Sequence, residues 1–221
     1  MNKLQLPEQQ FLPSGGLTKT RIKTVNYIGT GFVPVFMLVF FSMFATSVMA
    51  ESEKVLFSTD DIPNFVEYSE SLSSSGQPLK EHMPLLAEMG FDQIIYLALT
   101  TNRTALDKED ELVLKNDMNY LHVAVDFSKP SLKNFETVAL ILQNSKDQKS
   151  LLHCQVNYRA STFSFLYRVI YLGVPIGAAK EDLDKVWTPD SVWYQFLVNT
   201  LAAHGMTHEC DSCDWQERDF D

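Results

Sequence analysis

One stretch of the chain constrains its fold more than any other, the run from Ser150 to Gly173. A short apolar strand, Ser150 to His153, is followed by a tight loop and an apolar helical segment that starts near Arg159 and stops at Gly173. A strand that turns into a helix without a linker aims its loop amides and the helix N-terminus at one place, which suits an oxyanion. The stretch therefore predicts a buried strand of an α/β sheet with an anion site at its carboxyl end.

Two side chains of this stretch carry chemistry, Cys154 and Arg159. At the rim of a positive concavity, amide dipoles and a guanidinium favour a thiolate over a thiol, so Cys154 is predicted to be a nucleophile. Arg159 is predicted to hold two oxygens of the same anion in bidentate fashion. A lone cysteine after a buried strand also commonly serves as inert packing. The residues by themselves leave the catalytic and the structural interpretations open.

The order His-Cys, loop, Arg resembles the signature loop of the cysteine-dependent, dual-specificity-like protein phosphatases. That family usually has one residue more between Cys and Arg and a glycine in the loop. Here the loop residues are Gln155, Val156, Asn157 and Tyr158. Asn157 is the expected replacement for the glycine, because Asn tolerates the left-handed conformation. The short loop is similar to that of a bacterial branch related to a domain fused to beta-lactamase-like hydrolases, and its spacing also matches the rhodanese sulfurtransferases.

A second segment separates these two families. Ser75-Gly76-Gln77-Pro78 precedes a predicted helix, and Gly90-Phe91 leads into the apolar run at 93–99. This order resembles the opening of the same bacterial phosphatase branch, and rhodaneses do not characteristically begin in this way. The resemblance implies a central, mostly parallel sheet of four to five strands flanked by helices, as in dual-specificity phosphatases.

The resemblance also implies roles for single residues. Cys154 attacks a phosphoryl group, Arg159 and the loop amides stabilise its oxygens, and Asp126, which follows a predicted strand, protonates the leaving group. An aspartate also commonly ends a strand in a turn, so both roles of Asp126 stay open. His153 supports the loop. The substrate-binding set comprises Gln155, Val156, Asn157, Tyr158, Ala160 and Ser161. The resemblance implies neither a metal nor a cofactor.

Helical and strand patterns predict the remaining elements. The acidic residues of 107–111 are expected on a solvated helix face, and the segment 71–76 is expected to be flexible. The aromatic residues Trp187, Trp193, Tyr194 and Phe196 are expected to pack the domain. The predicted strands are 65–69, 93–99 and 120–125, and the predicted helices are 80–89, 107–116, 131–144, 178–186 and 191–203.

The N-terminal region resembles an export signal. Lys19, Arg21 and Lys23 precede the nearly uncharged stretch 25–49, which ends in small residues before Glu51. We expect 1–50 to be a signal peptide, with an uncleaved anchor as the alternative. Both place the remainder outside the cytoplasm, in the periplasm or secreted, with membrane contact only if the segment is uncleaved. The expected order is then a tether at 51–64, the phosphatase-like domain at 65–204 and an acidic tail at 205–221.

The charge of the chain restricts its partners. Removing residues 1–50 from the 18 basic and 28 acidic residues takes away four basic and one acidic, which leaves 14 and 27 and a net charge of −13. Such a surface argues against a nucleic-acid partner, which needs a basic footprint. A phosphorylated substrate, protein or small molecule, must be attracted locally, by the loop, by Arg159 and, as a further candidate, by Arg168.

The tail contains the remaining cysteines. His208, Cys210 and Cys213 are weak candidates for a zinc site together with His204. A local disulfide between the two cysteines is at least as well supported in an oxidising compartment, and a redox role is the third alternative. The predicted function is that of an exported cysteine-dependent phosphatase acting on phosphomonoesters, phosphotyrosine or another phosphoprotein among them. A sulfurtransferase with a Cys154 persulfide and a non-catalytic oxyanion-binding module are the alternatives.

Overall fold

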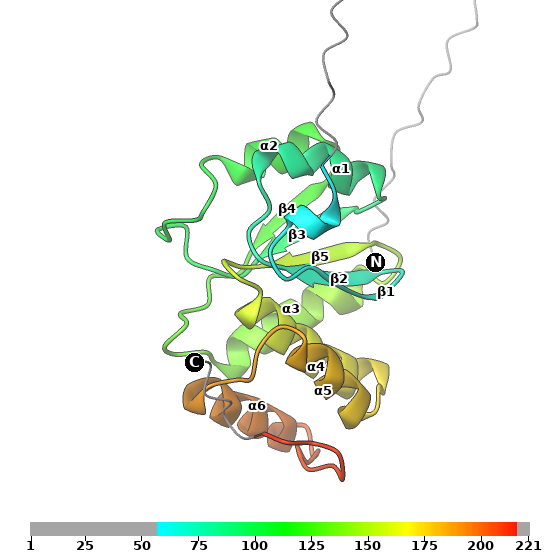
Figure 1. The fold of residues 1–221 in the computed structure, drawn as a ribbon, viewed down its shortest axis with the longest axis vertical. Coiled ribbons are helices and arrows are strands. Elements are labelled where there is room, and N and C mark those ends of the chain that lie inside the picture. Colours follow the sequence, from blue (N-terminus) through cyan, green and yellow to red (C-terminus); the bar gives the residue numbers. More distant parts are fainter. Residues whose placement is uncertain (1–56, 216–221) are drawn as a thin grey trace, which may run out of the picture. The chain divides into compact units, whose positions relative to one another are not determined.

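The computed structural model describes residues 57–215, which form an α/β domain around a five-stranded sheet of order β1-β2-β5-β3-β4 (Figure 1). β1 pairs antiparallel with β2, and the other neighbouring strands are parallel. The strands are β1 (Val66–Ser69), β2 (Leu72–Ser75), β3 (Gln93–Tyr96), β4 (Asn119–His122) and β5 (Ser150–His153). The predicted fold class, a mostly parallel sheet flanked by helices, is confirmed.

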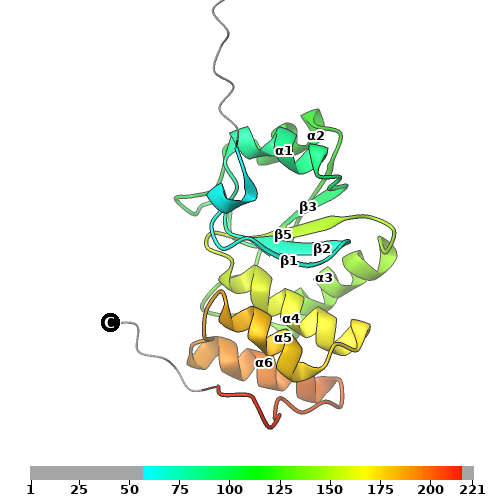
Figure 2. The same ribbon diagram turned by 45° about the vertical axis from the view of Figure 1, so that its right-hand side comes forward.

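Helices cover both faces of the sheet, α1 and α2 on one side and α3 to α6 on the other (Figures 1 and 2). The helices are α1 (Met83–Glu88), α2 (Glu109–Lys115), α3 (Leu132–Asn144), α4 (Tyr158–Leu172), α5 (Ile176–Asp184) and α6 (Ser191–Ala203). Short 3-10 turns at Thr59–Asp61 and Lys80–His82 precede β1 and α1.

The central strand β5 is buried along its whole length, as a parallel strand covered on both faces must be. Its side chains alternate between two hydrophobic clusters. Leu151 packs with Ile94 in the cluster under α1, while Leu152 packs with Ile95 in the larger cluster under α3 and α4. β5 therefore lies in the centre of the core, and its carboxyl end is fixed from both sides.

Local signals placed several element boundaries correctly. Gly173 ends α4 in the left-handed conformation at φ 66°, and Gly90 follows α1 at φ 81°. Pro84 lies in the first turn of α1, where its missing amide hydrogen costs no helical bond. Ser131 caps α3 by accepting a hydrogen bond from the Asn134 amide.

The expectation that 71–76 is flexible is wrong. Residues 72–75 form β2, whose four residues are all buried between β1 and β5. The serine-rich composition suggested a loop, but the ladder satisfies the backbone and some hydroxyls find partners. Ser74 Oγ lies 2.7 Å from the Tyr68 hydroxyl, and the Ser75 hydroxyl donates to the Gly76 carbonyl.

The C-terminal segment up to Trp215 packs against the helices. The Trp215 ring lies 5.8 Å from the rings of Phe165 and Tyr194, and its indole nitrogen donates to the His208 carbonyl oxygen. The predicted N-terminal signal, residues 1–50, lies outside the described residues. Within 57–215, no helix has the length and hydrophobicity needed to cross a membrane.

Candidate active site

Cys154 follows β5 directly, at the carboxyl end of the parallel strands, where α/β proteins bind ligands. It is fully buried, and it is the free cysteine of the described part of the chain. Its amide donates to the carbonyl oxygen of Ser75 at 3.2 Å. The start of the loop is therefore tied to the end of the neighbouring strand β2.

The segment 63–77 holds the loop from outside. The Gln77 amide donates to the Gln155 carbonyl at 3.0 Å, and Asn64 Nδ2 donates to the Val156 carbonyl at 3.0 Å. In a trans peptide the carbonyl and the next amide point in opposite directions. The amide of Val156 therefore points away from Gln77, toward the inside of the loop. An inward amide at this position suits an oxyanion.

Gly76 makes this contact sterically feasible. A Cβ atom at this position would lie 2.8 Å from Pro63 Cβ and 2.9 Å from the Gln155 carbonyl oxygen. A side chain here would push the loop away from the strand that holds it. The glycine of the Ser-Gly-Gln-Pro sequence is therefore explained by the packing of the loop.

Asn157 adopts the left-handed conformation, with φ 74° and ψ −2°. The predicted left-handed conformation of Asn157 is confirmed. Its side-chain amide also donates to the Asn64 carbonyl at 2.6 Å, which further anchors the loop. α4 begins at the next residue, Tyr158, so the free amides of the first helical turn follow the loop without interruption.

Arg159 is buried in the first turn of α4, with 4% of its surface exposed. Its Nε donates to the Val125 carbonyl at 3.0 Å, and its guanidinium lies 5.0 Å from the centre of the Phe127 ring. Among residues 57–215, no acceptor binds its two terminal nitrogens. The guanidinium is thus fixed at Nε and can present both terminal nitrogens to one anion.

Asp126 lies on the exposed loop after β4, next to the two residues that contact Arg159. Its carboxylate accepts hydrogen bonds from the Ser128 amide at 2.9 Å and the Ser128 hydroxyl at 2.8 Å. These bonds hold the pKa of Asp126 below its ordinary value. The carboxyl is therefore ionised at neutral pH in this arrangement. To act as a proton donor it must first take up a proton, which weakens both bonds.

Aromatic side chains fix the Asp126 loop. Trp193 Nε1 donates to the Phe127 carbonyl at 2.9 Å, and the Phe127 ring lies 5.3 Å from Trp193 and 6.0 Å from Trp187. Tyr158 stacks on Trp187 at 4.3 Å with the rings parallel. The predicted packing role of Trp187 and Trp193 is confirmed. Trp187 also contacts both Tyr158 of the anion loop and Phe127 of the Asp126 loop.

Three other residues of α4 were predicted to contact or attract the substrate: Ala160, Ser161 and Arg168. The Ser161 hydroxyl donates to the Tyr158 carbonyl at 3.2 Å within the first turn, and Ala160 is fully buried. The expectation that Arg168 attracts the substrate is wrong. Arg168 is buried farther along α4, where it pairs with Asp182 at 2.8 Å and its guanidinium lies 4.6 Å from the Tyr68 ring centre.

The tail cysteines form a disulfide, Cys210–Cys213. The zinc alternative fails for the described residues, because they contain no cluster of three or more metal-ligating side chains. His208 instead lies with its Nε2 2.9 Å from the Tyr194 hydroxyl. The disulfide belongs to the C-terminal segment that packs against the helices.

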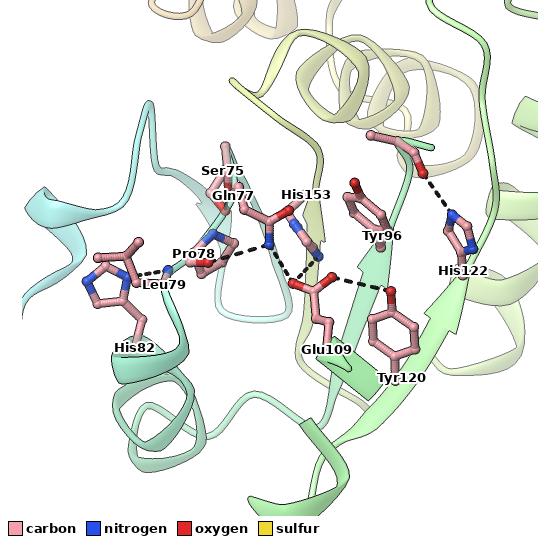
Figure 3. Close-up of polar contacts among 12 residues, drawn as sticks. Ser75, Gln77, Pro78, Leu79, His82, Tyr96, Glu109, Tyr120, His122 and His153 are labelled. Carbon is pink, nitrogen blue, oxygen red and sulfur yellow. Dashed lines mark hydrogen bonds and ion pairs between the residues drawn. The ribbon is translucent and has the colours of Figure 1, made fainter. Parts of the chain in front are cut away.

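Sequence reasoning missed a buried polar cluster behind the loop, formed by Gln77, Glu109, Tyr120 and His153 (Figure 3). The expectation that the acidic residues of 107–111 form a solvated face is wrong for Glu109, which is only 4% exposed. Glu109 lies four residues before the buried Val113, so both share the face of α2 that packs on the sheet. This four-residue spacing from an apolar residue is the sequence signal that indicates burial of Glu109.

Comparison with known proteins finds similarity to solved structures only. No family model matches the chain, and no curated protein matches it. A DUF442 protein described as a candidate phosphatase, from Shewanella putrefaciens CN-32, superposes with a TM-score of 0.62 at 26% identity, over 66% of this chain and 96% of the other.

Two further solved structures share the fold at lower identity. TpbA of P. aeruginosa gives a TM-score of 0.52 at 18% identity, over 64% of this chain and 86% of TpbA. The catalytic domain of the S. cerevisiae PP-IP phosphatase SIW14 gives 0.51 at 16% identity, over 61% and 83%. The chain therefore has the fold of the cysteine-based protein tyrosine phosphatase-like proteins, and the resemblance found in its sequence is confirmed.

Proposed function

We propose that this protein is a cysteine-dependent phosphatase that hydrolyses phosphomonoesters through a cysteinyl-phosphate. The observation that carries the proposal is the loop after β5. Cys154 opens it, its carbonyls at Gln155 and Val156 are bonded outward, and Arg159 closes it with both terminal nitrogens available. A nucleophile inside a nest of amides that ends in a guanidinium suits attack on a phosphoryl group.

The proposed reaction has two steps. In the first, the Cys154 thiolate forms a bond to phosphorus while the bond between phosphorus and the ester oxygen breaks. The leaving oxygen receives a proton, and Asp126 is the proposed donor. In the second step, water attacks the cysteinyl-phosphate, which releases inorganic phosphate and restores the thiolate. Arg159 and the loop amides stabilise the charge on the non-bridging oxygens in both steps.

The protonation of Asp126 is the step that the structure makes demanding. Its hydrogen bonds from Ser128 stabilise the ionised form. A phosphate dianion bound in the loop would raise its proton affinity, because two nearby negative charges oppose each other. Asp126, the proposed acid, therefore takes up its proton when the substrate binds.

Export to the periplasm or beyond is part of the proposal and rests on the N-terminal sequence pattern. In an oxidising compartment, a free thiol must be kept from oxidation. Complete burial of Cys154 gives it such protection in the absence of substrate. A disulfide between Cys210 and Cys213 is consistent with that compartment.

The test is hydrolysis of an aryl phosphate by the purified protein under mild reductant. Turnover should be abolished by Cys154→Ser, while a Cys210→Ser/Cys213→Ser variant keeps it. Cys154→Ser should still bind an oxyanion. Absence of turnover in the native protein would overturn the proposal. Sulfur transfer from thiosulfate would then indicate a sulfurtransferase, and sulfate binding without either reaction would indicate a binding module.

A further inference from the structure

The buried carboxyl group of Glu109 lies beside His153, the residue that precedes Cys154 (Figure 3). Glu109 Oε1 accepts a hydrogen bond from Gln77 Nε2 at 2.5 Å and lies 3.5 Å from His153 Nε2. Its Oε2 accepts a hydrogen bond from the Tyr120 hydroxyl at 3.3 Å. One carboxyl group therefore lies next to the segment after β2, to β4 and to the last residue of β5.

Two of these partners are the residues that hold the loop. Gln77 donates its backbone amide to the Gln155 carbonyl and its side chain to Glu109. His153 is bonded through the chain to Cys154 and faces Glu109 with its imidazole. The carboxyl of Glu109 thus accepts a hydrogen bond from Gln77 and lies 3.5 Å from the imidazole of His153, whose ring nitrogens have no hydrogen-bond partner among residues 57–215.

Among residues 57–215, no cation neutralises the charge of Glu109. His153 is fully enclosed, and burial lowers its pKa to about 3, so its imidazole is neutral at physiological pH. Lys108, the adjacent basic residue, pairs with Glu111 at the surface. Burial therefore raises the pKa of Glu109 to about 7, although the hydrogen bonds from Gln77 and Tyr120 oppose the shift.

Several titratable groups face this carboxyl. Tyr96 comes from β3, Tyr120 and His122 from β4, and His153 from β5, while Asp107, Lys108 and Asp110 flank Glu109 in the chain. With the exception of His153, these groups line a cavity of about 490 Å³ that Glu109 also lines. The cavity provides a route for proton exchange with solvent.

The Tyr96 ring connects Glu109 electrostatically to the nucleophile. It stacks on His153 at 4.8 Å and on His122 at 5.1 Å. Its pKa is raised to about 12, first by burial, then by the charge of Glu109 and, more weakly, by that of Cys154. A single buried ring therefore lies within electrostatic range of both side chains, in an interior where charges are poorly screened.

We propose that Glu109 is a positioning residue of the anion loop, whose carboxyl orients His153 and Gln77 and takes up a proton when an oxyanion enters the loop. An anion in the loop and an ionised Glu109 repel each other, so anion binding favours the protonated carboxyl. A protonated carboxyl group can donate a hydrogen bond, whereas an ionised one can only accept. Protonation of Glu109 therefore presents a donor to His153 in place of an acceptor. The inference rests on the proposed function only in requiring that the loop binds an oxyanion, not that it turns over.

The test uses sulfate, which does not titrate near neutral pH, and the full-length Cys154→Ser protein, in which the thiol cannot titrate. Sulfate affinity is measured by calorimetry from pH 6 to pH 8 in two buffers of different ionisation enthalpy. If the anion raises the pKa of Glu109 by about one unit, affinity falls about fivefold over this range and about half a proton is taken up near pH 7.5. Adding Glu109→Gln should remove both effects.

Glu111→Gln in the same background is the matched control. Glu111 is exposed on the same helix, so the pH dependence and proton uptake should remain. His122 is present in every variant, so its contribution cancels. Equal pH dependence with and without Glu109→Gln would overturn the inference while leaving the anion loop intact. Absence of sulfate binding at any pH would overturn the anion loop itself, and the proposed function with it.

A second variant keeps the test valid if Glu109→Gln does not fold. Tyr120→Phe removes a hydrogen bond that stabilises the ionised carboxyl. The transition in sulfate affinity should then move to higher pH. An unchanged transition would contradict the assignment of the proton to Glu109.

Discussion

Arg159 Nε donates to the carbonyl oxygen of Val125 at 3.0 Å, a bond between residues 34 positions apart in the chain. Val125 immediately precedes Asp126, so one hydrogen bond connects the proposed phosphate-binding group to the loop of the proposed acid. The guanidinium also lies over Phe127 on the same loop. One side chain therefore positions both the proposed anion site and the loop of the proposed acid.

Replacing Arg159 with lysine should lower kcat/KM for an aryl phosphate by about 100-fold or more. Lysine keeps the charge but has neither the planar pair of terminal nitrogens nor a fixed Nε donor. The exposed Arg103→Lys is the control and should leave kcat/KM unchanged. A loss smaller than about threefold would show that charge alone is sufficient and that the bidentate geometry is not used.

Trp193→Phe should lower kcat several-fold and the free energy of unfolding by about 1 kcal/mol, because the Phe127 carbonyl loses its donor. Trp215→Phe is a matched control, since it also removes an indole hydrogen bond to a carbonyl, that of His208, in the C-terminal segment. Its kcat should be unchanged. Steady-state kinetics and denaturant titration measure both effects. Equal losses of kcat in the two variants would refute a specific role of Trp193 at the Asp126 loop.

Ser128→Ala should move the basic limb of the kcat/KM pH profile to higher pH. The Ser128 hydroxyl stabilises ionised Asp126, so its removal lets the pKa of Asp126 rise toward its ordinary value. An acid with a higher pKa stays protonated to higher pH. In an Asp126→Asn background, the same substitution should not move the profile. A shift that persists there would exclude Asp126 as the titrating group.

Glu109→Gln should change how stability depends on pH. The folded-state pKa of Glu109, about 7, lies above its ordinary 4.5, so unfolding releases a proton between these values. The free energy of unfolding therefore falls as the pH rises through this window, by on the order of 3 kcal/mol. Glutamine does not titrate, and the variant should lack this fall.

His153 acts in the opposite direction on the same curve. Its pKa of about 3 lies below its ordinary 6.5, so its contribution to stability is complete above pH 6.5 and is lost as the pH falls toward 3. Because His153 is present in both proteins, the difference between native and Glu109→Gln isolates Glu109. Urea titrations at successive pH values measure this difference, and parallel curves would disprove the buried, protonatable carboxyl.

Local chemistry allowed the main element of the site to be predicted. The apolar strand 150–153, the loop and the helix stop at Gly173 were read from hydrophobic periodicity and from the conformational preferences of glycine. The left-handed Asn157 followed from the tolerance of Asn for positive φ. These signals lie within a few residues of the structure they determine, so no tertiary contact is needed to interpret them.

Burial of polar residues was predicted less well. The serines of β2 and the carboxyl of Glu109 have the composition of a loop and of a solvated face, and the structure buries both. Composition records the cost of burying a polar group but not the partner that offsets it. The strand β5, which pairs with the backbone of β2, and Gln77, which donates to Glu109, are both distant in the chain from the residues they contact.

The sequence by itself determined the nucleophile candidate, the arginine and the strand–loop–helix that brings them together, because strand period, helix caps and glycine positions act locally. Only the tertiary structure decided which residues hold this loop and the proposed acid in place. Asn64 and Gln77 bind the outward carbonyls of the loop, Val125 binds Arg159, and Trp193 binds Phe127. Each of these contacts joins segments 34 or more residues apart. Such pairs exist only once the sheet and its helices have packed.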